Sequence, residues 1–383
     1  MIIALVISCY GLIPVAGALL SRRIWRIFRR RFDDLRLRPI LDYGIYSRQK
    51  GGIYRFIGGF ESVTDGHTLW IRSDSLTIPV ALAEAQTYVL PMQEEGLLPG
   101  AFDPGEEAPE RIRWDRVSTL TEGAKVFVGG ALLLHEDRWT FVSTKETPLL
   151  VIFYDGPDRS LAVRAIRAGR HRNEYWNSIT PYALILGALS LISMAISFLS
   201  RPAFRLTAIT AFAATFIPLY PMVPPGLLFT VIYRRLWWRA RIFRAYRDLA
   251  RLPLKYFKGG EKEAGLPDGE RYGFVRYDSL PQAVRDGEVP LLIPEEENRK
   301  KAEWYIFGAL RGADAPTEPW FPTEPLDSFA TFGALPGNPE TLARRYTHRA
   351  YLFEIISWLL LLAGISLNAF FISQIIFLFQ RTG

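Results

Sequence analysis

The residues whose types could support catalysis or metal binding are few and scattered in this sequence. The densest group is His135, Glu136 and Asp137, three side chains of the kinds that bind metal ions. They lie between two β-rich runs, and adjacent residues of a strand point to opposite faces, so a polar hairpin tip explains them without a metal. We therefore assign no catalytic, cofactor-binding or metal-binding residue and expect no cofactor and no enzymatic activity.

The remaining histidines and the single cysteine add no catalytic pattern. His67 lies in a turn, whereas His171 and His348 lie among arginines at equivalent places before apolar runs. The sequence contains none of the patterns G-x-x-x-x-G-K-[ST], G-x-S-x-G and H-E-x-x-H. Because Cys9 is the only cysteine, an internal disulfide and a cysteine-based zinc site are excluded.

Four apolar runs predict how the chain is organised. A span needs about 20 apolar residues to cross the hydrocarbon core of a bilayer. Four runs reach that length, at 1–21, 179–200, 206–233 and 351–379, although 22% of all residues are charged. We read the first run as an uncleaved anchor, since it lacks the basic start of a signal peptide. The expected fold is α+β, with four transmembrane helices and two β-rich domains between them.

One of these runs carries four prolines, Pro218, Pro221, Pro224 and Pro225. Proline removes helix hydrogen bonds, so we expect the run 206–233 to be kinked or interrupted. Broken helices line substrate sites in transporters, but transport paths usually also need charged side chains. Only Glu354, near the start of the last run, meets that need. We therefore favour a structural kink and keep transport as an alternative.

Basic and aromatic residues follow the first and third runs, as RRIWRIFRRRF (22–32) and RRLWWRARIFRAYR (234–247). Arginine and tryptophan beside a span are typical of the membrane interface, where they contact anionic headgroups. The same composition occurs in nucleic-acid binding, but the position beside a span explains it without nucleic acid, which we do not expect as a partner. The residues assigned to this lipid interface are Arg22, Arg23, Trp25, Arg26, Arg29, Arg30, Arg234, Arg235, Trp237, Trp238, Arg239 and Arg241.

The distribution of arginines predicts the orientation of the chain. Arginines cluster at the inner ends of the runs, at 22–31, 164–172, 234–244 and 344–349. Positive charge near span ends marks the cytoplasmic side. We expect a multi-pass protein of the bacterial inner membrane with both termini outside and both large loops in the cytoplasm.

The two loops are expected to fold similarly, as 22–178 and 234–350. In the first, Trp25, Phe28, Phe32 and Leu35 share one face of a helix that Pro39 ends. Short β-rich runs separated by turns follow, which predicts a small barrel or sandwich. A second helix is expected from Ser160 to Gly169.

Matching stretches in the same order predict an internal parallel repeat. Each unit comprises a span, a basic helix, a β-rich domain and a second span. The principal matches are 26–40 with 241–254, 54–63 with 272–280, 130–132 with 308–310 and 161–176 with 342–355.

The stretch from Gly123 to Ile166, GAKVFVGGALLLHEDRWTFVSTKETPLLVIFYDGPDRSLAVRAI, is followed by an apolar run. A glycine-containing strand pair, an aromatic strand and a short helix before the membrane resemble the GIDE-type domain of membrane-anchored ubiquitin ligases. Those ligases end in a cysteine-rich RING, and one cysteine cannot form it. The resemblance therefore implies a membrane-anchored interaction domain without ligase activity.

These observations predict a non-enzymatic membrane scaffold or adaptor that presents two GIDE-like domains to a protein partner or to a second copy. Two alternatives stay open. The first is a small transporter or channel component that uses the third run. The second is a membrane-bound enzyme acting on lipids or nucleotides, which would gather His67, His135 or acidic residues in one pocket.

Overall fold

The computed structural model describes residues 1–65, 67–73, 76–90, 110–112, 124–135, 137–167, 174–257, 261, 263–293, 303–310 and 321–382. It has the expected α+β content. The chain divides into two compact units, one of residues 1–26, 172–244 and 347–383 and the other of 27–171 and 245–346. Both predicted β-rich loops contribute to the second unit.

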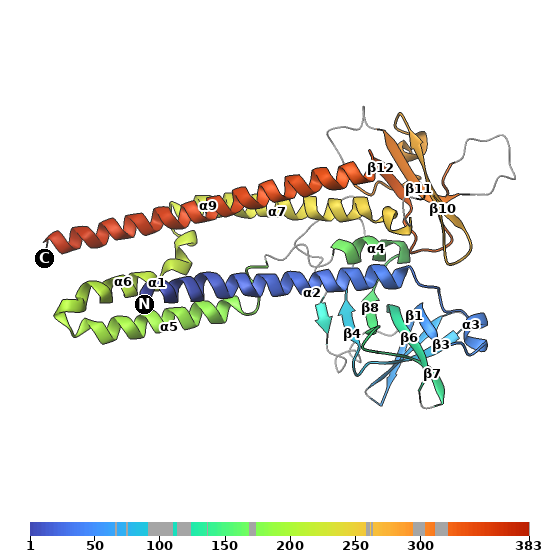
Figure 1. The fold of residues 1–383 in the computed structure, drawn as a ribbon, viewed down its shortest axis with the longest axis horizontal. Coiled ribbons are helices and arrows are strands. Elements are labelled where there is room, and N and C mark those ends of the chain that lie inside the picture. The colour runs from blue at the N-terminus through green and yellow to red at the C-terminus, as the bar shows by residue number, and fades with distance from the viewer. Residues whose placement is uncertain are drawn as a thin grey trace. The chain divides into compact units, whose positions relative to one another are not determined.

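The described part of the first unit is helical (Figure 1). Three of its helices run on into the second unit, because no proline or glycine interrupts them there. The helical elements are α1 (Ile2–Val6), the π-helical η1 (Ile7–Leu12), α2 (Ile13–Arg36), α5 (Thr180–Leu199), the 3-10 turn η3 (Pro202–Phe204), α6 (Arg205–Thr215), the 3-10 turn η4 (Ile217–Met222), α7 (Gly226–Arg251) and α9 (Pro339–Thr382).

Three stretches of helix are long and apolar enough to cross a membrane: Ile2–Arg36, Thr180–Leu199 and Pro339–Leu378. They contain the first, second and fourth predicted spans. The run 206–233 is not a single helix, because α6 ends at Thr215 and α7 begins only at Gly226. The predicted interruption is confirmed, whereas four transmembrane spans stay a prediction.

The basic helix after the first run is part of α2 rather than a separate element. It ends at Arg36, three residues before Pro39, as that proline predicted. Phe28, Phe32 and Leu35 lie in the part of α2 that belongs to the second unit. All three are buried, which confirms the predicted apolar face of the helix. The end of the first apolar run and the basic amphipathic stretch that follows it therefore belong to one continuous helix.

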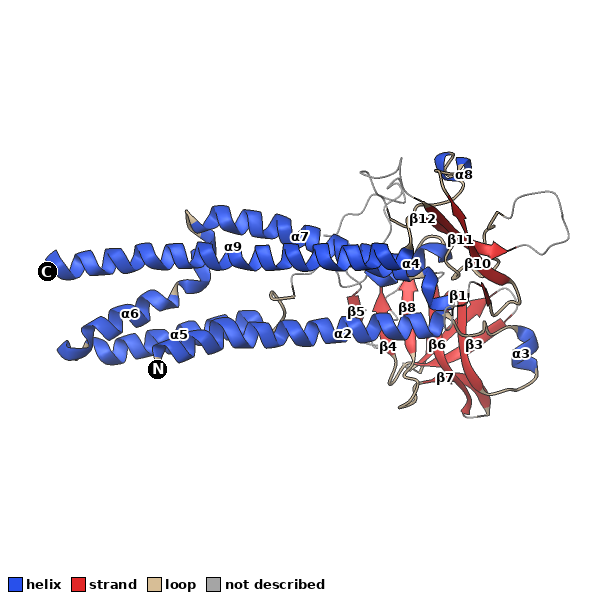
Figure 2. Cartoon of the chain, turned by 45° about the horizontal axis from the view of Figure 1, so that its top comes forward, coloured by secondary structure: helices blue, strands red, loops and turns tan. Residues whose placement is uncertain are grey.

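The larger sheet of the second unit contains a small barrel (Figure 2). The order of its eight strands is β1-β2-β3-β7-β6-β8-β4-β5, and an additional pairing between β1 and β6 closes the first five into a ring. β3 pairs with β7 in parallel. This strand order is that of the OB barrel, a fold that serves many functions and specifies none of them. The strands are β1 (Gly52–Thr64), β2 (Thr68–Ser73), β3 (Leu76–Ala81), β4 (Gln86–Val89), β5 (Glu110–Ile112), β6 (Lys125–His135), β7 (Arg138–Val142) and β8 (Leu150–Tyr154).

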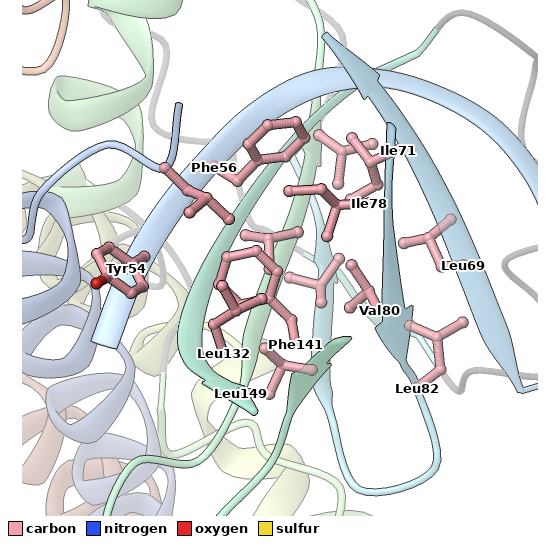
Figure 3. Packing of buried hydrophobic residues seen from close by; sticks show 14 of the residues in the cluster. Tyr54, Phe56, Leu69, Ile71, Ile78, Val80, Leu82, Leu132, Phe141 and Leu149 are labelled. Atoms are coloured by element: carbon pink, nitrogen blue, oxygen red, sulfur yellow. The ribbon is translucent and has the colours of Figure 1, made fainter. Parts of the chain in front are cut away.

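Alternating apolar residues of these strands fill the barrel (Figure 3). Phe56, Ile71, Ile78, Leu132 and Phe141 are each at most 2% exposed. The register of β1 against β2 shifts between Phe60 and Ser62, which marks a β-bulge or irregularity in this pair. The short helices α3 (Tyr43–Ser47) and α4 (Asp158–Arg167) belong to the same unit, and α4 confirms the predicted second helix.

A second, smaller sheet in this unit has the order β12-β11-β10-β9. Every neighbouring pair in it is antiparallel. The elements from this part of the chain are the 3-10 turn η5 (Pro253–Tyr256), β9 (Glu263–Gly265), β10 (Arg271–Tyr277), α8 (Gln282–Arg285), β11 (Trp304–Leu310) and β12 (Gly333–Pro336).

Candidate functional site: a buried arginine, glutamate and aromatic cluster

The helical unit contains a buried ionic cluster centred on Glu174, just before α5. Its carboxylate accepts hydrogen bonds from Arg22 Nε of α2 at 2.8 Å and from Arg241 Nη1 of α7 at 2.8 Å. Arg241 Nη2 bonds the second carboxylate oxygen, so this pair is bidentate. Glu174 is 6% exposed and Arg241 is 2% exposed. Glu174 therefore joins α2 to α7 through paired charges.

Glu354 extends the cluster from α9. Arg244 Nη2 donates to Glu354 Oε2, and Arg241 Nη2 lies 4.0 Å from Glu354 Oε1. Arg241 is thus placed between two carboxylates from different parts of the chain. Glu354, the charged residue near the start of the last apolar run, is therefore paired with arginines of α7.

Aromatic rings enclose these charges. Tyr175 packs edge-on against Trp358, with ring centroids 4.6 Å apart, and against Trp237 at 5.5 Å. The guanidinium of Arg241 stacks over Trp237 at 4.4 Å, and that of Arg22 lies 5.7 Å from the Tyr175 ring. Cation–π contacts strengthen when water is excluded, so the rings hold the arginines in place as well as burying them.

The segment that carries Glu174 and Tyr175 is fixed by Asn177. Its Oδ1 accepts from the backbone N–H groups of Ile179 and Thr180, at the start of α5, at 2.9 and 3.2 Å. Its Nδ2 donates to the Glu174 carbonyl at 2.9 Å. A Cβ at Gly17 of α2 would lie 2.5 Å from Asn177 Oδ1, so a side chain there would displace this segment.

The cluster, defined as Arg22, Glu174, Arg241, Arg244 and Glu354, contains three arginines and two glutamates. Some of its polar atoms, and the indole beside it, have no hydrogen-bond partner within the described part of the chain. They are Trp237 Nε1, Arg241 Nε, Arg244 Nε and Glu354 Oε1. An unsatisfied buried polar group costs about 1–3 kcal/mol of folding free energy, so these four atoms destabilise the folded state.

A second polar arrangement in the helical unit lies at the break between α6 and α7. Asn368 of α9 donates from Nδ2 to the carbonyls of Tyr220 and Val223 at 2.7 and 2.9 Å. Asn368 is 5% exposed, although it lies in the middle of an apolar run. Each of these carbonyls also accepts a backbone N–H, Tyr220 from Val223 at 3.2 Å and Val223 from Leu227 at 3.0 Å, so Asn368 adds a second bond to each and ties α9 to the break.

The other unit contains its own buried charges, which connect segments from opposite halves of the sequence. Arg55 of β1 is fully buried and pairs with Asp327, and its Nε donates to the Arg38 carbonyl at 2.7 Å. Arg36, also fully buried, donates to Tyr256 Oη at 2.8 Å and to the Phe329 carbonyl at 3.2 Å. These bonds tie β1 and the end of α2 to the segment that precedes β12.

Lys255 lies beside this connection. It pairs with Asp33, which also accepts from Arg36 Nε at 3.2 Å. Burial lowers the pKa of the Lys255 ammonium to about 8, and the charges of Arg29 and Arg30 act in the same direction. Charging this lysine therefore works against folding.

The residues predicted to face lipid divide by exposure. Trp237 and Arg241 are buried inside the helical unit, where they contact Tyr175 and Glu174. Arg22, Trp25 and Arg29 are partly buried. The exposed members, for which lipid contact stays a prediction, are Arg23, Arg26, Arg30, Arg234, Arg235, Trp238 and Arg239.

The histidines are not brought together. His67 follows β1, His135 ends β6 and His348 lies on α9, while Glu136 and His171 fall outside the described residues. No group of three potential metal ligands occurs in the part of the chain that was described. Sequence reasoning missed Glu174 and Asn368. The match between 161–176 and 342–355 could have indicated Glu174, because it places this residue within one position of Glu354.

Comparison with known proteins gave no relative: no family model, no curated protein and no solved structure matches the chain.

Proposed function

We propose that this protein is a non-enzymatic membrane scaffold or adaptor that presents its β-sheet unit to a protein partner. The observation that carries the proposal is that the buried carboxylates are paired with arginines far away in the sequence. Glu174, Glu354 and Asp327 each pair with an arginine more than 60 positions away. These carboxylates, which could otherwise take part in catalysis, thus hold distant segments together, as expected of a rigid scaffold.

We further propose that the chain is a multi-pass protein of the bacterial inner membrane, with both termini outside. Three apolar helices support membrane insertion. The third predicted span, at 206–233, would combine α6, η4 and the start of α7, and the Tyr220 and Val223 carbonyls at the break accept hydrogen bonds from backbone N–H groups and from Asn368. The arginines near the span ends support cytoplasmic loops.

An internal duplication is part of the proposal, and the strand pairings support it. β1 pairs with β6 and β6 with β8, as β10 pairs with β11 and β11 with β12, all antiparallel. A helix follows each set, α4 in one case and α9 in the other. The register differs by one residue from the sequence match, because Tyr54 faces Gly130 whereas Tyr272 faces Ala309.

The resemblance to the GIDE-type domain suggests how such a platform would work. The stretch that resembles it includes β6, β7, β8 and α4, which belong to the larger sheet and the helix after it. In this proposal the sheet unit is an interaction module held at the cytoplasmic face. The partner is a protein or a second copy of the chain.

Crosslinking tests the scaffold directly. We would purify the tagged protein from its native cells in a mild detergent, crosslink it and identify the linked peptides by mass spectrometry. We expect a stoichiometric partner, or a second copy, linked to residues 51–164 or 259–345. Recovery of the protein alone, with no crosslinks to another chain, would contradict the proposal.

Transport through the interrupted segment is a second candidate, and the break itself favours it. Two of the carbonyls at the break are already engaged by Asn368, so they are not available to a substrate. A proteoliposome flux that disappears in Glu354→Gln, while the sheet unit stays folded, would replace the scaffold proposal with this one.

A further inference from the structure

We propose that the cluster around Arg241 is a binding site for a phosphate group, supplied by the headgroup of an anionic lipid. The starting point is the set of N–H groups left over after the cluster's ion pairs are formed. Trp237 Nε1, Arg241 Nε and Arg244 Nε are buried donors with no acceptor among the described residues. This inference goes beyond the scaffold proposal and does not depend on it.

The three donors share one face of α7. Trp237, Arg241 and Arg244 are separated by four and three positions, which places them one above another along a helix. The Arg241 guanidinium also stacks directly on the Trp237 ring, so these two donors are neighbours in space as well. A single ligand could therefore accept from more than one of them.

The excess of donors identifies the chemistry of the ligand. Three unpartnered N–H groups stand against one unpartnered acceptor, Glu354 Oε1. The cluster also contains one more arginine than glutamate, so it carries a net positive charge. A group rich in acceptors and negatively charged complements both features, and phosphate is the anion whose geometry suits guanidinium donors.

The position of the cluster favours a lipid as the source of the phosphate. Arg22 and Glu354 lie in Ile2–Arg36 and Pro339–Leu378, two of the stretches long and apolar enough to span a membrane, and Glu174 directly precedes the third. Exposed arginines and an exposed tryptophan, Arg234, Arg235, Arg239 and Trp238, lie on the same α7 segment. The side chains of Arg22 and Arg244 are 25% and 15% exposed, so the cluster is open to its surroundings beside them.

Two conservative substitutions isolate the donors. Trp237→Phe keeps an aromatic ring under Arg241 and removes the indole N–H. Arg244→Lys keeps a positive charge for Glu354 and removes Nε. Trp176→Phe and Arg48→Lys make the same chemical changes at exposed positions that were not assigned to the lipid interface, and they serve as matched controls. Circular dichroism and size-exclusion chromatography establish that each full-length variant is folded, and Arg244→Lys carries the test if Trp237→Phe is not.

The experiment is native mass spectrometry of the full chain from nanodiscs of phosphatidylcholine mixed with phosphatidylglycerol. We expect one retained phosphatidylglycerol per chain, with retention reduced about tenfold in Trp237→Phe and Arg244→Lys, the size of a lost bond to a charged group. The matched controls should retain lipid as the wild type does.

A second arm adds inorganic phosphate to the protein in detergent. Saturable phosphate binding that the same two variants lose would assign the site to free phosphate. Equal retention in all variants, or none in the wild type in either arm, would overturn the proposal.

Discussion

Arg55 and Asp327 form an ion pair that joins β1 to the segment before β12, from opposite halves of the sequence. The pair bridges 272 positions, and the two side chains are 0% and 1% exposed. The Arg55 guanidinium also lies 5.2 Å from the Phe329 ring. Removing one partner of a buried ion pair leaves the other charge buried and unpaired, so the stability of the fold depends on this contact.

Replacing Arg55 with methionine should destabilise the protein by about 3–5 kcal/mol, because Asp327 would keep a buried charge without its partner. The double variant Arg55→Met with Asp327→Leu should lose less than the two single variants together, since neither charge remains. Thermal unfolding followed by circular dichroism in detergent measures both. Arg48→Met, at an exposed position, is the control. Additive losses in the double variant would show that the pair is not coupled.

Replacing Asn368 with leucine should lower the unfolding temperature, although leucine is the more apolar residue. The substitution removes one of the two hydrogen bonds that each of the Tyr220 and Val223 carbonyls accepts, at about 0.5–1.5 kcal/mol for each lost bond. The exposed Gln374 on the same helix offers the comparison, and Gln374→Leu should be neutral. If both variants unfold at the wild-type temperature, Asn368 does not hold the break.

Gly187 should not tolerate a larger side chain. A Cβ there would lie 2.6 Å from Tyr10 Cε1 and 2.7 Å from Cys9 Cβ, so α5 and η1 would have to separate. Gly187→Val is expected to cost about 1–3 kcal/mol by overpacking. Gly11→Val, where nothing lies within 4 Å, should be tolerated. The unfolding temperatures of the two variants make the comparison, and equal values would refute the close approach.

Stability should rise with pH between about 8 and 10.5 through Lys255. Its folded pKa of about 8 lies below the ordinary value of 10.5, so in this window the unfolded chain binds more protons than the folded one. The penalty for its charge is complete below pH 8 and is relieved above it. The difference in unfolding temperature between wild type and Lys255→Met should therefore change across this window. The exposed Lys50→Met should show no such change, and a flat difference for Lys255→Met would contradict the burial of its charge.

The proposed orientation predicts which positions a membrane-impermeant thiol reagent reaches. In a Cys9→Ala background, cysteine in place of Ser200, exposed in the link after α5, should label in intact cells. Cysteine in place of Glu61, exposed in β1, should label only after permeabilisation. The reverse pattern would invert the topology.

The sequence by itself determined the elements whose signals are local. Apolar length predicted three helices that could cross a membrane, Pro39 predicted the end of α2, and the prolines of 206–233 predicted its interruption. Alternation and turn residues predicted short strands in a small barrel or sandwich after α2, although not β5. Each follows from neighbouring residues, because helix and strand periods and the missing N–H of proline act over a few positions.

Only the tertiary structure decided which charges face one another. Arg22, Arg23, Arg241 and Arg239 are alike in sequence, yet Glu174 pairs with the first and third while the other two are exposed. The closing of β1 onto β6 and the pairing of Arg55 with Asp327 likewise join segments far apart in the chain. Such contacts depend on where the folded backbone brings distant residues together, and composition and spacing carry no record of that. The physical reason is that a buried charge is stabilised by the partner it meets in space, not by its neighbours in sequence.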